Sequence, residues 1–509
     1  MNVVNDLFFE LLQVVIGNRQ GLSRVPTPEE WEEIYEMSKK QSLAGIAFAG
    51  VERLPQEQMP PGKRIRQWAV KAEKIREHNA KVSEDCRVIS RFFEENGFDC
   101  VILKGQGNFA YYPEWLQGLR SAGDIDVWCW PKSKIDGNGK TTDGSDGHGY
   151  NKDNKDNKDN KNKVQGTRYK VQGCKNLLNQ RAEASDLNSL NSEASAEVLN
   201  QREARLEHPV RAVIEFCLSK KRGEYVYYHN LDFPVLKATP VEVHYRPTWL
   251  YNPFRNRVLQ RWFASQVQEV QRVQERARKF KVYDGYKIPS VEFNVVFQLL
   301  HLYKHIFEEG IGLRQLLDYY FVVQNINDND TQSEIATKTK RPSDYENGSN
   351  NKDNRDNKDN IILLNSLNQR AIASDLNSEA SAEVLNQRGA RLELFKKLGL
   401  KEFAGAVMYV MREVFAMPEE RMLCRPDEKR GRKLLEEILI GGNFGKYDER
   451  YNWAETTNGS MDYRGASYAV ARLRHNFQFL RDYPSEVLWE PIFRVYHWVW
   501  RKFQLWKFE

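Results

Sequence analysis

The most constraining feature of the chain is a pair of aspartates separated by one apolar residue, Asp124-Ile125-Asp126. Apolar residues continue with Val127 and Trp128, which is typical of a buried strand. Successive side chains of a strand point to opposite faces, so both carboxylates would share one face, about 6–7 Å apart, while Ile125 and Val127 enter a core. Two carboxylates this close raise the pKa of at least one of them unless a cation lies between them. The pattern therefore predicts a site for a hard divalent metal ion, usually Mg²⁺.

Polar residues also mark the ends of other predicted strands. An apolar run ends at Lys104 and Gly105, and Arg120 stands four residues before the first aspartate. Further along, the stretch VEVH alternates apolar and polar residues, which predicts a strand with Glu242 and His244 on one face. Glu242 is therefore a candidate third carboxylate.

In this order, the segments LKG, RxxxDID and VEVH resemble the uncharacterised nucleotidyltransferase family of the polymerase-β-like superfamily. The resemblance implies an α+β fold, in which a small mixed-sheet module lies between N-terminal and C-terminal helical regions. It also implies that three carboxylates are both catalytic residues and metal ligands: Asp124, Asp126 and Glu242. Superfamily members often carry a Gly-Ser pair after the first strand. This chain has Lys104-Gly105-Gln106-Gly107, as the resembling family does, which leaves the acceptor substrate open.

The activity implied by the resemblance is Mg²⁺-dependent transfer of a nucleoside monophosphate from an NTP to an unidentified hydroxyl acceptor, with Mn²⁺ as the alternative ion. Asp124 and Asp126 would hold one ion on the triphosphate and share a second with Glu242 at the acceptor hydroxyl. Two ions about 3.5–4 Å apart stabilise the attacking and leaving oxygens of an in-line displacement. The expected nucleotide-binding residues beside them are Lys104, Gly105 and Arg120.

Two arginines have alternative roles. Arg120 is near enough in sequence to be a structural partner of Asp124 instead of a phosphate ligand. Arg314 belongs to a G-x-R-x-x-x-D segment that resembles one in the family's helical domain, which implies that Arg314 binds nucleotide phosphates and is held by Asp318. Residues four apart share a helix face, so the same pair would equally form a surface ion pair worth about 0.3–0.5 kcal/mol.

Two histidines four residues apart, His301 and His305, have a spacing that can bind zinc. No glutamate follows the first histidine directly, and the sequence offers no third ligand nearby. We therefore favour a partly buried, hydrogen-bonded pair at a junction between domains.

Two polar stretches, residues 136–206 and 326–393, share the segment SEASAEVLNQR and are rich in Asn, Asp, Lys and Ser. Few large apolar side chains are present to offset chain entropy, so both are predicted to be disordered low-complexity insertions, not solenoid repeats. The first interrupts the catalytic module. The other predicted regions are an N-terminal helical region (1–97), the nucleotidyltransferase-like module (98–250), a helical domain (251–325) and a C-terminal helical region (394–509).

Between the first insertion and Glu242, the pattern predicts a strand at Glu224–Tyr228 and a turn at Leu231–Pro234. With the insertion set aside, Glu242 and the two aspartates are expected on neighbouring strands.

The cytoplasm is the expected location. The first helix-like segment contains Asp6 and Glu10 and lacks a basic start, so it does not resemble a signal peptide. No apolar run reaches the roughly 18–20 residues of a membrane span. Six scattered cysteines without C-x-x-C spacing are typical of reduced thiols.

The C-terminal stretch PIFRVYHWVWRKFQLWKF is dense in aromatic and basic residues. Such a helix suits a membrane interface, or packing of its aromatic face while lysine and arginine stems extend over the surface. We favour packing.

Two other functions compete with nucleotidyl transfer. One is a catalytically silent member of the fold that acts as a binding or scaffold protein. The other is a basic nucleic-acid-binding protein, but the net charge of +6 is modest for 509 residues and does not demand nucleic acid. Clustered acids also disfavour a phosphate backbone, so nucleic acid is ranked last.

Overall fold

The computed structural model describes residues 3–132, 209–220, 226–236, 239–272, 280–338, 388–451 and 466–506. Met1–Pro131 and Ala212–Glu509 belong to one compact unit, and all that follows concerns this unit. The division of the chain into four folded regions stays a prediction.

The predicted disorder of residues 136–206 and of residues 339–387 falls outside the described residues. The predicted bounds of the second insertion are too wide, because helix α9 (Leu313–Lys338) continues past residue 326 and residues 388–398 are helical. A helix can extend into polar sequence once its apolar part is anchored, because each further residue adds one backbone hydrogen bond.

The centre of the unit is a four-stranded mixed sheet, as expected for an α+β fold. Its strands are β1 (Phe98–Ile102), β2 (Ile125–Pro131), β3 (Asn230–Asp232) and β4 (Val241–His244). Their order is β1-β2-β4-β3. Strands β2 and β4 are parallel, whereas β1 and β3 pair antiparallel with their neighbours.

One part of this region was predicted wrongly. Leu231, expected in a turn, pairs with Val243 in strand β3. Of the predicted strand, the structure describes residues 226–228, and there Val226 forms a β-bridge with Leu231. Pairing with the buried strand β4 outweighs the local turn propensity of this short segment.

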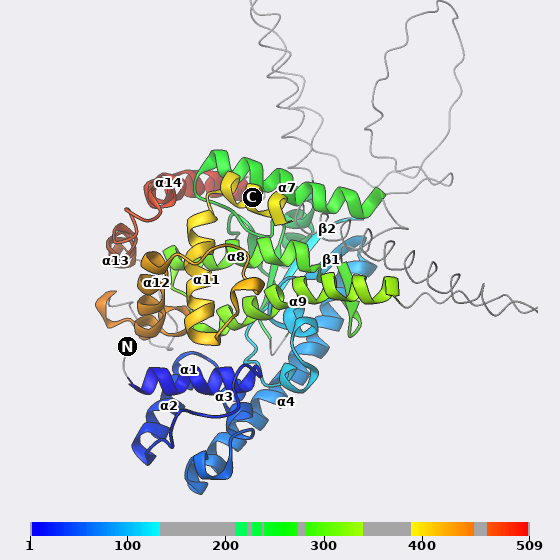
Figure 1. The fold of residues 1–509 in the computed structure, drawn as a ribbon. Helices are drawn as coiled ribbons and strands as arrows, with labels where there is room; N and C mark the ends of the chain where they lie inside the picture. Colours follow the sequence, from blue (N-terminus) through cyan, green and yellow to red (C-terminus); the bar gives the residue numbers. More distant parts are fainter. Residues whose placement is uncertain are drawn as a thin grey trace, which may run out of the picture. The chain divides into compact units, whose positions relative to one another are not determined.

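Helices surround the sheet (Figure 1). Besides α9, the described α-helices are α1 (Val3–Val15), α2 (Pro28–Lys40), α3 (Ala44–Val51), α4 (Gly62–Glu95), α5 (Glu114–Gln117), α7 (Pro253–Arg272), α8 (Val291–Glu308), α11 (Lys401–Phe415), α12 (Glu428–Gly441), α13 (Ala466–Phe477) and α14 (Pro484–Trp506), and residues 209–220 and 388–398 are also helical. Helices α8 and α9, which begin in the predicted helical domain, pack side by side (Figure 1). Trp128 of β2 stacks on Phe293 of α8, with ring centroids 5.4 Å apart. Since Asp126 and Trp128 share a strand face, α8 covers the face that carries the aspartate.

A β-hairpin, β5 (Phe280–Tyr283) and β6 (Tyr286–Pro289), lies within the range expected to be helical. Its turn residues Asp284 and Gly285 have φ angles of 48° and 85°. Two residues with positive φ form the tight turn for which Asp-Gly is a strong signal.

The first helix packs against the C-terminal helical region. Helix α1 contacts α11, and the side chains of Gln13 and Asn18 donate hydrogen bonds to the carbonyls of Val414 (3.2 Å) and Phe415 (2.7 Å). The N-terminal and C-terminal helical regions therefore share one core.

Helix α14 packs through one face. Phe493 stacks on Trp249 at 5.9 Å, and Glu486 accepts a hydrogen bond from the backbone N–H of Tyr251 at 2.8 Å. The opposite face exposes Ile492 and Trp498. Packing is thus confirmed for one face, and membrane contact stays a prediction. Among the described helices, none combines the length and apolar character needed to span a membrane.

The segment that follows β1 is a 3₁₀ helix, η2 (Gly105–Tyr111), which brings the chain back against the strand. A Cβ atom at Gly107 would lie 2.2 Å from the carbonyl oxygen of Ile102, so a larger residue does not fit. At Gly123, by contrast, a Cβ would meet nothing within 4 Å.

We expect Gly107→Ala to lower the free energy of unfolding by about 1–3 kcal/mol or more, because backbone atoms have to move apart. Gly123→Ala is the matched control and should change it by less than about 0.5 kcal/mol. Urea unfolding followed by circular dichroism measures both. Equal stabilities of the two variants would contradict the close approach at Gly107.

A pH dependence follows from Glu486. Burial raises the pKa of its carboxyl group from 4.5 to about 7, against the opposing hydrogen bond from Tyr251 and the charge of Arg255. The unfolded chain ionises near pH 4.5 while the folded chain keeps the proton, so stability falls as pH rises from about 4.5 to 7 and is level above that.

Glu486→Gln cannot ionise and should remove a decline on the order of 1–3 kcal/mol in this pH window. Unfolding in urea at half-unit pH steps measures the slope, and Glu36→Gln, at an exposed carboxylate, should leave the slope unchanged. An unaltered slope in Glu486→Gln would show that another group is responsible.

Candidate functional site

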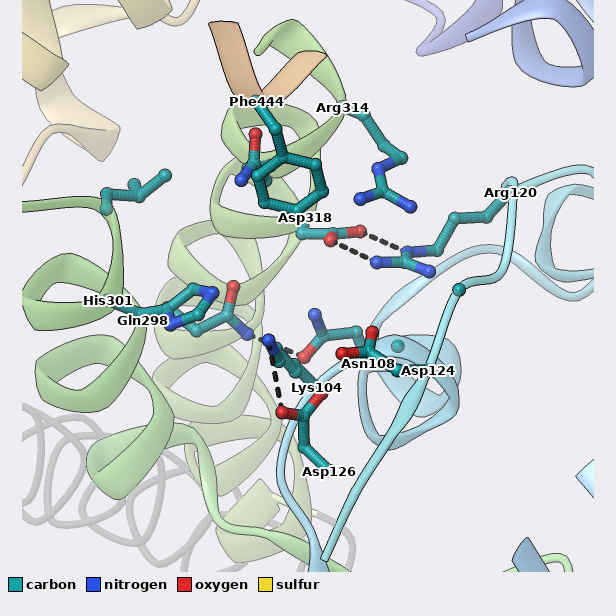
Figure 2. A pocket seen from close by; sticks show the side chains of 14 residues that line it. Lys104, Asn108, Arg120, Asp124, Asp126, Gln298, His301, Arg314, Asp318 and Phe444 are labelled. Atoms are coloured by element: carbon teal, nitrogen blue, oxygen red, sulfur yellow. Dashed lines mark hydrogen bonds and ion pairs between the residues drawn. The ribbon is translucent and has the colours of Figure 1, made fainter. Parts of the chain in front are cut away.

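A pocket lies where the end of β1, the start of β2 and helices α8 and α9 meet (Figure 2). It encloses about 490 Å³ of space not filled by atoms, its open mouth included. Six of the seven residues predicted for the site line this pocket: Lys104, Gly105, Arg120, Asp124, Asp126 and Arg314. The seventh, Glu242, is placed beside Asp126 by the sheet.

The parallel pairing of β2 and β4 sets the position of the carboxylates. In its register, Asp126 stands directly opposite Glu242, and Trp128 stands opposite His244. Alternation along β4 places Glu242 and His244 on one face, as the sequence predicts. One donor atom from each of Asp126, Glu242 and His244 lies within 4.8 Å of the others. The imidazole was not predicted as part of this group, although the VEVH alternation contains the signal.

Asp126 is the most buried of these groups, with 1% of its surface exposed. Its Oδ1 atom accepts hydrogen bonds from Lys104 Nζ at 3.1 Å and from His244 Nε2 at 2.9 Å. Burial alone would raise the pKa of Asp126, but Lys104 and His244 outweigh burial and hold the pKa at about 2. The Oδ2 atom is buried and has no hydrogen-bond partner among the described residues.

His244 lies between two acceptors. Its Nδ1 is 3.2 Å from the carbonyl oxygen of Pro247, while Nε2 faces Asp126 and is 3.7 Å from Glu242 Oε2. Burial lowers the pKa of His244, but the hydrogen bonds with Asp126 and Glu242 raise it above its usual value. Both nitrogens face oxygen acceptors, so each is placed to donate a hydrogen bond, and this arrangement favours the doubly protonated ring.

The other two carboxylates differ in their protonation. Burial, followed by the charge of Asp126, raises the pKa of Asp124 to about 6. Burial also acts to raise the pKa of Glu242, but the hydrogen bond with His244 leads the effects that bring it below its usual value. Glu242 Oε2 also accepts a hydrogen bond from Asn230 Nδ2 at 2.6 Å. Lys104 lowers the pKa of Asp124, but burial and the charge of Asp126 outweigh it.

Arg120 does not pair with Asp124. Its guanidinium forms two hydrogen bonds of 2.7 Å with the carboxylate of Asp318 on α9, which also accepts a hydrogen bond from Tyr112 at 2.6 Å. The proposed local ion pair of Arg314 with Asp318 at a surface is therefore wrong. Both residues are buried, and Asp318 uses its two oxygens for Arg120 and Tyr112. A contact between positions 198 residues apart outcompetes the neighbour four residues away, because it forms a bidentate pair.

Arg314 lies on the same side of the pocket as Arg120, opposite Lys104 and Asp126 (Figure 2). It donates one hydrogen bond to the carbonyl of Ser121 at 2.8 Å, and its buried Nε has no hydrogen-bond partner among the described residues. Burial, and then the charge of Arg120, lowers the pKa of Arg314 to about 10. A buried guanidinium with a lowered pKa favours a bound anion, which would stabilise its charge.

Amide side chains complete the wall, and no sequence pattern pointed to them. Asn108 Oδ1 accepts a hydrogen bond from Gln298 Nε2 at 2.5 Å, and the Nδ2 of Asn108 is buried without a partner among the described residues. The same is true of Nε2 of Gln315. These residues come from η2, α8 and α9, so only the folded chain brings them together.

The histidine pair matches the favoured prediction. His301 and His305 are hydrogen-bonded, with their Nε2 atoms 3.1 Å apart. Burial holds the pKa of each well below its usual value, so both rings are neutral. Within the described residues, the donor group of three or more metal-ligating side chains is the one around Asp126, and it does not include this pair.

The Arg120–Asp318 pair should be costly to break. Asp318→Asn leaves the buried Arg120 charge without its counterion, and we expect it to lower the free energy of unfolding by about 3–5 kcal/mol. Arg432→Gln removes an exposed helix pair with Glu428 and should cost far less than Asp318→Asn, because solvent screens this pair. Urea unfolding measures both, and similar costs would argue against a buried pair.

The chain was compared with protein families, curated proteins and solved structures. The model of an uncharacterised nucleotidyltransferase family matches residues 27–137 and 189–343, which is more than half of the chain and includes β1, β2, β4 and the helices α8 and α9. No curated protein and no solved structure among those compared gives a match. By its sequence and by the strands that carry its acidic residues, this chain belongs to the uncharacterised nucleotidyltransferase family.

Proposed function

We propose that the protein transfers a nucleoside monophosphate from an NTP to a hydroxyl acceptor, with a divalent ion, Mg²⁺ or Mn²⁺, as cofactor. The observation that carries this proposal is the register that sets Asp126 opposite Glu242 at the edge of a pocket with a buried arginine on its other side. Carboxylates on one side and guanidinium on the other suit a metal-bound triphosphate.

The residues present fit a hard divalent cation. Asp126 offers a buried oxygen without a partner among the described residues, and Glu242 stands directly opposite Asp126 on the neighbouring strand. Asp124 lines the same pocket, and burial and then the charge of Asp126 raise its pKa, so a bound cation would stabilise its ionised form. Asp124, Asp126 and Glu242 would hold the ion. When bound, the ion would supply positive charge to the triphosphate and to the reacting oxygens.

The chain's own cations would bind the phosphates. Lys104 Nζ contacts Asp126, and its side chain is 19% exposed, so it can also reach an anion in the pocket. Arg314 lines the opposite side of the pocket, and its buried Nε has no hydrogen-bond partner among the described residues. Arg120 would not bind the phosphates itself, because Asp318 accepts two hydrogen bonds from its guanidinium. We assign Arg120 to positioning the segment before β2.

The proposed transfer exchanges one oxygen–phosphorus bond for another. The acceptor oxygen forms a bond to the α-phosphorus, the bond from that phosphorus to the β-phosphate oxygen breaks, and pyrophosphate leaves. The hydroxyl proton passes to a carboxylate of the site. Lys104 and Arg314 would stabilise the charge that develops on pyrophosphate, so most of the catalysis is positioning and electrostatic stabilisation.

A nucleotide-binding protein without transfer activity is the second candidate. The observation that favours it is the ion pair of Lys104 with Asp126, because this lysine occupies an oxygen that a metal ion would need. The two candidates differ in whether bound NTP is consumed.

Glu242→Gln separates them. The glutamine oxygen can still accept the hydrogen bond from Asn230, so we expect the melting temperature to change little, whereas loss of the carboxylate should reduce transfer at least about 100-fold, the scale of one electrostatic contact in a transition state. The assay incubates the full chain with each α-³²P-labelled NTP, Mg²⁺ or Mn²⁺, and cell extract, and follows both self-labelling and labelled acceptors. Glu428→Gln, at an exposed carboxylate, is the control.

Stabilisation of the wild-type protein by NTP and Mg²⁺ in a thermal-shift assay, without transfer to any acceptor, would favour the silent candidate. Full activity of Glu242→Gln would contradict the proposed site.

A further inference from the structure

One wall of the pocket comes from a part of the chain that the family match does not cover. Phe444 lines the pocket and belongs to a short 3₁₀ turn, η4 (Asn443–Gly445), after helix α12. The family match ends at residue 343. In Figure 2 the ring of Phe444 points into the pocket on the side of Arg314.

The backbone of Phe444 is in an unusual conformation. Its φ and ψ angles are 56° and 33°, in the left-handed region, where bulky side chains are rare. Glycine adopts such angles without strain and stands at positions 442 and 445 of the same turn. Position 444 nevertheless carries an aromatic residue. Strained positions of this kind gather at ligand sites, where the surrounding structure holds them.

The surrounding structure does hold this turn. A Cβ at Gly445 would lie 1.9 Å from the carbonyl oxygen of Glu309, and a Cβ at Gly312 would lie 2.8 Å from the Cα of Asn443. The turn thus packs backbone against backbone on the connection between α8 and α9. This contact fixes the position of the Phe444 ring relative to the pocket.

The ring has a flat face among charged and amide groups. It lies 5.5 Å from the guanidinium of Arg314 and 5.4 Å from the ring of His305, measured from the ring centroid. Phe444 is only half-buried, so part of the ring remains open to the pocket. Phosphates and metal ions gain nothing from a phenyl ring, whereas a nucleobase can stack on it.

A hydrogen-bond donor lies in the same pocket. Gln315 Oε1 accepts a hydrogen bond from the backbone N–H of Gly312 at 2.7 Å, which orients the amide. Its Nε2 is buried without a partner among the described residues. Gln315 lines the pocket, and a ring nitrogen or carbonyl oxygen of a base would satisfy this unpartnered N–H group.

We infer that Phe444 is the platform on which the nucleobase of the substrate stacks, so that the C-terminal region completes the nucleotide pocket. This inference rests on the proposed function, because it takes a nucleotide as the ligand. Stacking is tolerant of base identity, so the platform would strengthen binding of every NTP, and Gln315 would contribute to the choice among them.

The test compares two probes in titration calorimetry with Mg²⁺, namely ATP and inorganic tripolyphosphate, which lacks the base and sugar. Phe444→Gly removes the ring at a position where glycine fits the backbone without strain. We expect it to weaken ATP binding about tenfold and to leave tripolyphosphate binding unchanged. Phe444→Leu keeps an apolar side chain but has no aromatic face, and it should weaken ATP binding similarly, whereas Phe444→Tyr should bind like the wild type.

Each result has a distinct meaning. Equal ATP affinity of Phe444→Gly and the wild type would overturn the platform. Equal weakening of ATP and tripolyphosphate would also overturn it, because the ring would then only shape the pocket. If the wild type binds tripolyphosphate but binds ATP no more tightly, the platform fails and phosphate binding stands. If the wild type binds neither probe, the proposed function fails, and the inference fails with it.

Discussion

The site depends on one pairing of two short parallel strands. Because side chains alternate along a strand, a slip of one residue between β2 and β4 would move Glu242 to the opposite face from Asp126. The buried pair Val127 and Val243 stands opposite each other in the same register, so the core resists that slip. Hydrophobic packing on one side of the sheet thus fixes the electrostatics on the other side.

The charges of the site are arranged as two groups with different tasks. Around Asp126, Lys104 and His244 hold the pKa of one carboxylate at about 2, while burial and the charge of Asp126 raise the pKa of Asp124. Across the pocket, Asp318 neutralises Arg120 in a buried bidentate pair, while burial and the charge of Arg120 lower the pKa of Arg314. The first group contains three carboxylates, and the second contains two guanidinium groups and one carboxylate. A metal-bound polyphosphate is a ligand whose two ends match this difference.

The sequence was informative wherever the signal was local. Alternation predicted that Asp126 and Glu242 lie on neighbouring strands, and it placed Asp124, which directly precedes β2, beside them. It failed where a distant contact decides. The partner of Arg120 is Asp318, nearly two hundred positions away, and a rule for residues four apart assigned that carboxylate to the wrong arginine. Phe444 carried no signal at all, since its place in the pocket comes from a turn packed against α8 and α9. The β5–β6 hairpin is different, because its turn carries a local signal, the Asp284-Gly285 pair, within a range that was expected to be helical.

The packing of α1 on α11 has a consequence for how this chain can be shortened. A recombinant fragment limited to residues 27–343 would lack both helices, and the surfaces they cover on α3 and α9 would meet water instead. Large newly exposed apolar patches promote self-association. Attempts to isolate a minimal catalytic fragment should therefore keep both α1 and α11, since each of these helices covers apolar surface of the other.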